Sequence, residues 1–121
     1  MKYMSVPPAP RFALVAALLL AASIITGCGS SRKDLPPVPE LNLASFSDNL
    51  RERLKPVYDR ARSNPDDSEA VGELGLLLEA HQLLDAAETA FVRARGLAPE
   101  SFRWIYHLGL TRAAAGKHRE A

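Results

Sequence analysis

Few residues of this 121-residue chain have side chains suited to covalent or acid–base chemistry. The only cysteine is Cys28, and the three histidines are His81, His107 and His118. The histidines are not spaced to share one helical face with a carboxylate or thiol partner, and the sequence has no zinc-type, haem-attachment or phosphate-binding glycine motif. We therefore predict no catalytic centre, no metal site and no cofactor, and we expect a protein that is not an enzyme.

Cys28 is informative because of the residues that precede it. Lys2 and Arg11 place positive charge ahead of an apolar run at 12–25, and the first acidic residue is Asp34. This layout is typical of a secretory signal. The run is too short for a stable membrane span, because about 20 apolar residues are needed to cross the hydrocarbon core.

Residues 25–28 (Ile-Thr-Gly-Cys) resemble the bacterial lipobox. The resemblance implies that residues 1–27 are a lipoprotein signal peptide and that the Cys28 sulfur carries a diacylglyceryl group after cleavage. It also implies a palmitate-type lipid anchor in the bacterial cell envelope and a protein that faces the periplasm. Gly29 favours the outer over the inner membrane, and an ordinary N-terminal anchor is the alternative interpretation.

The length and the charge of the remaining chain limit its domain count and its possible partners. Cleavage before Cys28 would leave 121 − 27 = 94 residues, enough for one small domain. Loss of Lys2 and Arg11 would leave 15 − 2 = 13 basic against 14 acidic side chains, so no basic field would attract nucleic acid. A single cysteine also excludes an intramolecular disulfide.

Residues 28–44 contain the lipidation candidate and a proline-rich stretch, Leu-Pro-Pro-Val-Pro at 35–39. Prolines at this density favour extended polyproline geometry, with a rise of about 3.1 Å per residue. We predict a disordered linker that holds a domain up to about 50 Å from the bilayer. A docking peptide is the alternative interpretation of the proline cluster.

Residues 45–64 show a helical apolar period and are predicted to form an N-terminal half-repeat or capping helix. Ser45 with Asp48 is compatible with a capping box at its start. Pro56 removes a backbone donor and should kink the helix or divide it near Lys55.

The remaining residues repeat with a period of 34. When the chain is shifted by that length, the residues that match are Pro65 with Pro99, Val71 with Ile105, Leu74 with Leu108, Gly75 with Gly109, Leu76 with Leu110, Ala80 with Ala114, and Ala87 with Ala121. A period of this length resembles the tetratricopeptide repeat. The family's structural positions correspond here to Val71, Leu74, Gly75, Leu78, Ala87, Phe91, Ala94, Pro99 and Gly109.

The resemblance implies an all-α fold, a tetratricopeptide-type α-solenoid of antiparallel helix hairpins. A first unit would occupy residues 65–101, and an incomplete second unit would occupy 102–121. Gly75 and Ala87 are small, which suits a close helix crossing, and Phe91 can fill the space beside it. A solenoid normally needs at least three units. We therefore expect a fragment of a longer repeat protein, or an end that a partner or a second copy covers.

Three positions complete the repeat pattern or depart from it. Asp66 or Asp67 is a suitable N-cap for the helix that follows. Gln82 stands where the family has a turn glycine, whereas Gly116 supplies that glycine in the second unit. Arg112 occupies a position where an apolar residue is expected.

Stacked hairpins form a concave face that is lined by the first helix of each unit. By resemblance, the positions that face a ligand are Glu69, Gly72, Leu76, Glu79, Ala80, Arg103, Tyr106, Leu110, Ala113 and Ala114. Their mixture of apolar and polar side chains suits an extended segment or a helix of similar character. Trp104 and Tyr106 are the predicted aromatic anchors, with packing between units as the alternative for Trp104.

The leading hypothesis is a membrane-anchored tetratricopeptide repeat lipoprotein that acts as a protein–protein interaction scaffold at the bacterial cell envelope. A protein or peptide would occupy the groove, and no small-molecule substrate is expected. The alternatives are an N-terminal accessory module of a longer envelope enzyme and a self-associating structural spacer.

Overall fold

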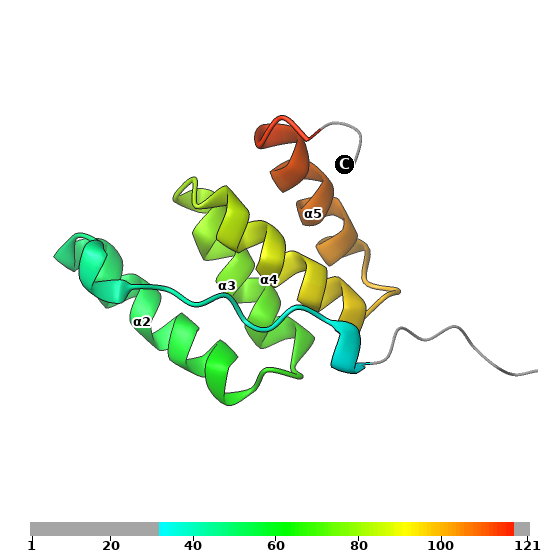
Figure 1. Cartoon of the computed structure of the whole chain (residues 1–121), viewed down its shortest axis with the longest axis horizontal. Helices are drawn as coiled ribbons and strands as arrows, with labels where there is room; N and C mark the ends of the chain where they lie inside the picture. The colour runs from blue at the N-terminus through cyan, green and yellow to red at the C-terminus, as the bar shows by residue number, and fades with distance from the viewer. Residues whose placement is uncertain (1–31, 118–121) are drawn as a thin grey trace, which may run out of the picture.

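The structure, a computed structural model, describes residues 32–117, and within them the fold is helical (Figure 1). The elements in chain order are the 3-10 helices η1 (Arg32–Asp34) and η2 (Leu43–Ser45), then α2 (Asp48–Ser63), α3 (Ser68–Ala80), α4 (Leu84–Leu97) and α5 (Phe102–Ala114). The prediction of an all-α fold is confirmed for this part of the chain, in which no strand occurs. The proposed signal peptide, Cys28 and the last four residues lie outside the described range. None of the described helices is long and apolar enough to cross a membrane.

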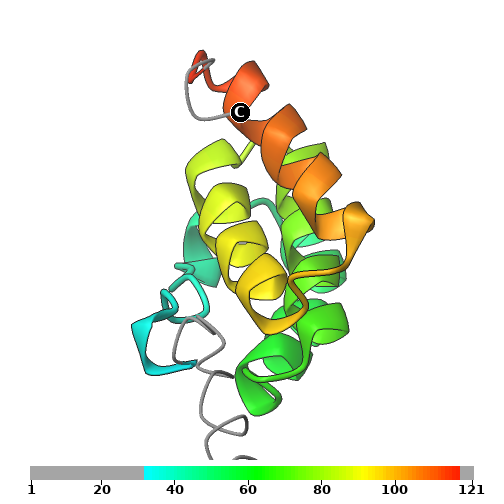
Figure 2. The same cartoon turned by 90° about the vertical axis from the view of Figure 1, so that its right-hand side faces the viewer.

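The four α-helices lie side by side, and short loops reverse the chain between them (Figures 1 and 2). α3 packs against both α2 and α4, and α4 also packs against α5, which lies at one edge of the array. Both α3 and α5 contain 13 residues, and their first residues are 102 − 68 = 34 positions apart. The sequence period is therefore also the period of the helix boundaries.

Helix α2 begins and continues differently from the sequence-based expectation. Its N-cap is Ser47, whose Oγ accepts a hydrogen bond from the Leu50 backbone N–H at 3.5 Å. Ser45 is not available as a cap because it ends η2 and donates its hydroxyl to the Asn42 carbonyl. Pro56 does not divide the helix, which is continuous to residue 63. Pro56 is exposed, so water can satisfy the carbonyl that loses its donor.

The ends of α3 follow from local chemistry. The Asp67 carboxylate caps its start and accepts hydrogen bonds from the backbone N–H groups of Glu69 and Ala70. Its C-terminal turn contains Gln82 with φ of 60°, and the turn after α5 contains Gly116 with φ of 77°. These residues are 116 − 82 = 34 positions apart, so both turns use the same left-handed geometry.

The core runs between neighbouring helices, from the contact of α2 with α3, through that of α3 with α4, to that of α4 with α5. The largest fully buried side chains are Trp104, Phe91, Leu54, Leu74, Leu78 and Val71. At the centre, an ideal Cβ on Gly75 would lie 2.7 Å from Cε1 of Phe91. The missing side chain at this position therefore lets α3 and α4 pack closely around the phenylalanine ring.

The prediction of a disordered linker is wrong for residues 35–42, which we call the strap. The strap lies across α4 and α2 (Figure 1). Leu35 packs on Gly96 of α4, and Pro39 is buried. The Leu41 N–H donates to the Tyr58 hydroxyl of α2 at 3.1 Å. Apolar side chains and backbone hydrogen bonds thus hold the proline-rich segment against the helices, which a local sequence pattern could not reveal.

Candidate protein-binding face

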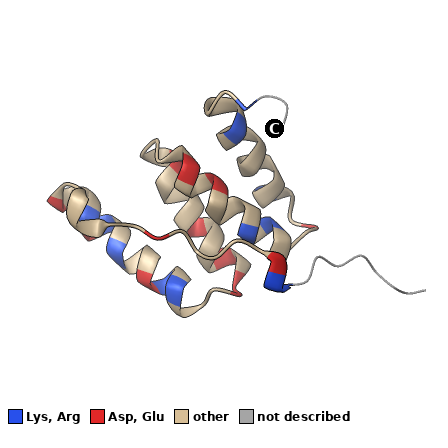
Figure 3. Ribbon diagram, viewed as in Figure 1, with Lys and Arg blue, Asp and Glu red and all other residues tan. Residues whose placement is uncertain are grey.

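The exposed side of α5 carries a continuous row of apolar side chains. Among the residues that the structure describes, the large hydrophobic side chains with high exposure are Phe102 (75%), Tyr106 (51%), Ile105 (43%) and Leu110 (43%). Their spacing of three and four residues places them along one helical face, which we call the α5 stripe. α5 contains no acidic residue and carries basic side chains at Arg103 and Arg112 (Figure 3). Exposed apolar patches of this kind are typical of protein interaction sites.

The opposite side of α5 packs against α3 and α4. Trp104 and Thr111 are fully buried there, and Leu108 is nearly so. The Trp104 ring stacks with Phe91 at a centroid separation of 6.2 Å, and the Arg103 guanidinium lies 4.5 Å from the Trp104 ring centroid. Trp104 therefore packs between helices and is not an exposed anchor. This agrees with the alternative given for it in the sequence analysis, which was packing between units. Tyr106 is the predicted anchor that stays exposed.

Gly72, which the repeat pattern placed toward a ligand, is instead covered by Trp104. An ideal Cβ on Gly72 would lie 2.3 Å from Cη2 of Trp104, so the glycine provides the space that the indole occupies. Trp104 aligns with Ala70 in the 34-residue period, and both residues are buried. Ile105 aligns with the buried Val71, but it is exposed and joins the stripe.

The charged residues predicted to face a ligand form pairs between α3 and α5. Glu69 accepts a hydrogen bond from Arg103 at 2.9 Å, and both side chains remain about half exposed. Glu79 bonds through one oxygen to Nδ1 of His107 at 2.8 Å and accepts the Thr111 hydroxyl through the other at 2.9 Å. Glu79 therefore joins two helices and has little capacity left for a ligand.

The remaining predicted positions divide between the core and the surface. Leu76 is partly buried against the core, whereas Leu110 is exposed on the α5 stripe. Ala80, Ala113 and Ala114 are also exposed. The structure thus places Tyr106 and Leu110 on one apolar surface and adds Phe102 and Ile105, which the sequence analysis did not include. Phe102 could have been found, because it lies one turn before Tyr106 and their rings stack at 5.9 Å.

Arg112, where an apolar residue was expected, has an acidic partner. Its Nε donates to Glu88 of α4 at 2.9 Å, and Lys117 donates to the other Glu88 oxygen at 2.6 Å. The hydrogen bond from Lys117 holds the pKa of Glu88 below its ordinary value; burial opposes this, and the bond from Arg112 adds to it. The same bond to Glu88 raises the pKa of Lys117. These contacts fasten the end of α5 to α4.

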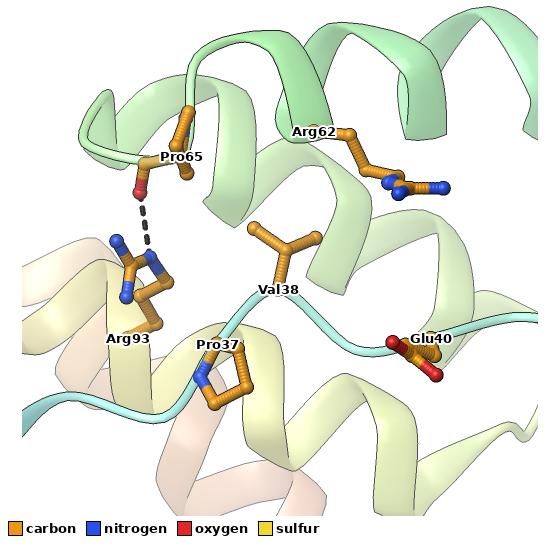
Figure 4. Close-up of a pocket in the computed structure, with 6 residues that line it drawn as sticks. All are labelled: Pro37, Val38, Glu40, Arg62, Pro65 and Arg93. Atoms are coloured by element: carbon orange, nitrogen blue, oxygen red, sulfur yellow. Dashed lines mark hydrogen bonds between the residues drawn. The ribbon is translucent and has the colours of Figure 1, made fainter.

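A second region of interest is an open hollow of about 300 Å³ beside the strap. Figure 4 shows the residues that line it: Pro37, Val38, Glu40, Arg62, Pro65 and Arg93. Arg93 is nearly buried and donates to the Pro65 carbonyl, the Pro36 carbonyl and the Asp66 carboxylate at 2.6, 3.0 and 2.9 Å. Its guanidinium is thus engaged by three structural acceptors. The hollow lies beside the docked strap, and the other charged side chains that line it, Glu40 and Arg62, are exposed at the surface.

Arg93 was missed by the sequence analysis. Its sequence position could have indicated a buried role, because Arg93 lies close to the apolar row formed by Ala87, Ala90 and Ala94 on α4. Within residues 32–117, no group of three or more His, Cys, Asp and Glu side chains could hold a metal ion. His107 is occupied by Glu79, so the described part of the chain shows its clearest candidate surface at the α5 stripe.

Comparison of the chain with protein-family models, with curated proteins and with solved structures found no match. The assignment of a function therefore depends on the arrangement of the chain's own residues. Among these, the exposed apolar row on α5 is the feature that packing within residues 32–117 leaves unexplained.

Proposed function

We propose that this protein is a membrane-anchored lipoprotein of the tetratricopeptide repeat type, which binds other proteins at the bacterial cell envelope and faces the periplasm. The observation that carries the binding role is the α5 stripe, whose members Phe102, Ile105, Tyr106 and Leu110 expose large apolar surfaces on one helix face. A folded helix has no internal reason to keep these groups in water, because burying them would be favourable. A protein partner supplies that burial.

Three structural features support the repeat type. α3 and α5 are related by the 34-residue period, and each is followed by a left-handed turn residue, Gln82 or Gly116. Gly75 meets Phe91 where α3 and α4 pack together. Each of these features agrees with a hairpin unit that recurs along the chain.

The lipid anchor is supported by the sequence around Cys28, which lies outside the described residues. Replacement of Cys28 by serine removes the sulfur that would carry the lipid. We expect metabolic labelling with palmitate to mark the parent chain, and the Cys28→Ser variant to remain unlabelled and uncleaved. Equal labelling of both chains would contradict the anchor.

The binding role is tested by quantitative capture of proteins from an envelope extract. We expect Tyr106→Ala to reduce the amount of a specific partner by about tenfold or more, because truncation of a central aromatic residue typically costs an interface about 2 kcal/mol or more. Arg53→Ala is the matched control, since Arg53 is an exposed residue of α2 away from the stripe. A partner retained equally by all three chains would mean that the stripe is not its binding surface.

A further inference from the structure

The docked strap shortens the connection between Cys28 and the helices. With a free linker, the first fixed residue would be Asp48 at the start of α2, and 48 − 28 = 20 residues span up to about 70 Å. In the structure the strap is already packed on α4 at Leu35. The chain from Cys28 to Leu35 advances by 35 − 28 = 7 residues, which span at most about 25 Å. Docking of the strap therefore reduces the reach of a lipid anchor on Cys28 to about a third.

The start of the strap is held by two different kinds of contact on α4. An ideal Cβ on Gly96 would lie 2.2 Å from Cδ2 of Leu35, so the leucine side chain occupies space that a larger residue at position 96 would fill. The carbonyl of the next residue, Pro36, accepts a hydrogen bond from the nearly buried Arg93 at 3.0 Å. The strap is thus fixed to α4 from its first residues, before the chain reaches α2.

These contacts place the start of the strap at one end of the molecule. η1, which precedes the strap, lies near the end of α4, and the α2–α3 turn (64–67) and the α4–α5 turn (98–101) are found at the same end (Figures 1 and 2). The α3–α4 turn (81–83) lies at the opposite end (Figure 1). We call the end that carries η1 and the two turns the tethered end.

The charge of the tethered end is close to balanced. In η1, the two turns and the helical turns that border them, the exposed basic side chains are Arg32, Lys33, Arg60, Arg62, Arg95 and Arg103, and the exposed acidic side chains are Asp34, Asp66, Asp67, Glu69 and Glu100. Lipid headgroups would therefore neither repel this end nor attract it strongly. Affinity for the membrane comes from the lipid chain, and the docked strap provides the orientation.

We propose that the tethered end faces the membrane and that the docked strap holds Leu35 within about 25 Å of the bilayer surface. The inference rests on the proposed lipid anchor and specifies how the anchored domain is presented. The α3–α4 turn then points away from the bilayer. A free linker would instead allow any orientation at distances up to about 70 Å.

The test measures energy transfer from the protein to the membrane surface. The full chain is produced with its lipid in bacterial cells and reconstituted into vesicles of phosphatidylethanolamine and phosphatidylglycerol that carry an acceptor dye on some headgroups. Because the lipid occupies the Cys28 sulfur, a cysteine introduced by Glu100→Cys or Asp85→Cys is the only free thiol for a short-range donor dye. Both positions are exposed, and position 85 lies about 18 Å from the tethered end along α4. We expect transfer from position 100 to be about twofold or more above transfer from position 85.

Two changes test whether the short tether sets this distance. Gly96→Leu fills the space of the Leu35 side chain, and its release of the strap is verified by chymotrypsin cleavage after Leu41. An insertion of about ten glycine and serine residues between Ser31 and Arg32 lengthens the tether by up to about 35 Å without touching the strap contacts. Each change should lower transfer from position 100 by about twofold or more. Gly109→Leu is the control, because it adds the same side chain where no described atom lies within 4 Å, and it should leave transfer unchanged.

The outcomes separate this inference from the proposed anchor. Equal transfer from positions 100 and 85 of the lipidated chain would overturn the inference alone, because the domain would then have no preferred orientation. Transfer from position 100 that stays high after the insertion, or after verified release of the strap, would also overturn it, since the docked tether would not set the distance. Absence of lipid on Cys28, read by palmitate labelling, would defeat the anchor and this inference together.

Discussion

The indole of Trp104 lies directly against the backbone of Gly72, and this contact joins α5 to α3. An ideal Cβ at Gly72 would be 2.3 to 2.5 Å from three atoms of the indole ring. Trp104 is fully buried and also contacts Phe91, so the ring has little freedom to move away. The absence of one methyl group on α3 therefore determines how closely the two helices pack.

We expect Gly72→Ala to lower the free energy of unfolding by about 1–3 kcal/mol, because the added methyl group overpacks the core. Gly109→Ala is the matched change on α5, where the methyl group enters open space. This second substitution should raise stability by about 0.5–1 kcal/mol through helix propensity. Urea unfolding followed by Trp104 fluorescence measures both, and equal effects of the two substitutions would contradict the assigned contact.

The sequence predicted the features that depend on local spacing. Val71, Leu74 and Leu78 lie one helical turn apart, and a row of this kind is buried whenever another helix covers it. The Asp67 cap follows equally from a short side chain placed directly before a helix. These features need no knowledge of distant residues, which is why spacing alone could identify them.

The features that the sequence could not predict depend on distant residues. The strap has no periodicity, and its position depends on Arg93 and Tyr58, which belong to different helices. Trp104 aligns with the much smaller Ala70, and the room for its ring is provided by Gly72 on another helix. The pairing of Glu79 with His107 and Thr111 likewise requires the relative position of α3 and α5.

Arg93 is expected to control whether the strap stays docked. Arg93→Ala removes donors from the Pro36 and Pro65 carbonyls and from the Asp66 carboxylate. The loss should cost about 1.5–3 kcal/mol, the usual contribution of hydrogen bonds to a charged group. The strap should also become a substrate for chymotrypsin after Leu41, measured by mass spectrometry of the fragments.

Arg95→Ala provides the control for strap release, because Arg95 lies on the same helix but is exposed. Its cleavage pattern and stability should match those of the parent chain. If Arg93→Ala leaves the strap as resistant to chymotrypsin as in the parent, the apolar contacts of Leu35 and Pro39 suffice for docking. The role assigned to the guanidinium would then be wrong.

Gln82 has a backbone geometry that suits glycine. Its φ of 60° lies in the left-handed region, where a residue with a Cβ loses about 1–2 kcal/mol. Glycine avoids that strain but loses more entropy on folding, so we expect Gln82→Gly to raise stability by about 0.5–1 kcal/mol. Thermal unfolding of the parent, Gln82→Gly and Gln82→Ala measures the effect. Alanine keeps the strain and should give no gain, and equal gains from both substitutions would exclude backbone geometry as the cause.

Glu88 should make stability depend on pH in a defined direction. Its pKa is lowered in the folded chain, so its contribution is present above the ordinary value of 4.5 and is lost as the pH falls through the lowered value. The pKa of Lys117 is raised, so its contribution is present below 10.5 and is lost as the pH rises through the raised value. Glu88→Gln should therefore lower the urea midpoint at pH 7. The difference from the parent should shrink in strong acid and in strong base.

Asp85→Asn is the comparison for this pH dependence, because the Asp85 side chain is almost fully exposed and lies 3.6 Å from Lys117. Exposed ion pairs contribute little to stability, so its removal should shift the urea midpoint much less than removal of Glu88. Glu88 accepts bonds from both Arg112 and Lys117 and is largely buried, which concentrates the stabilisation on one carboxylate. Equal midpoint shifts for the two substitutions at pH 7, or a Glu88→Gln effect that persists undiminished at low pH, would contradict this assignment.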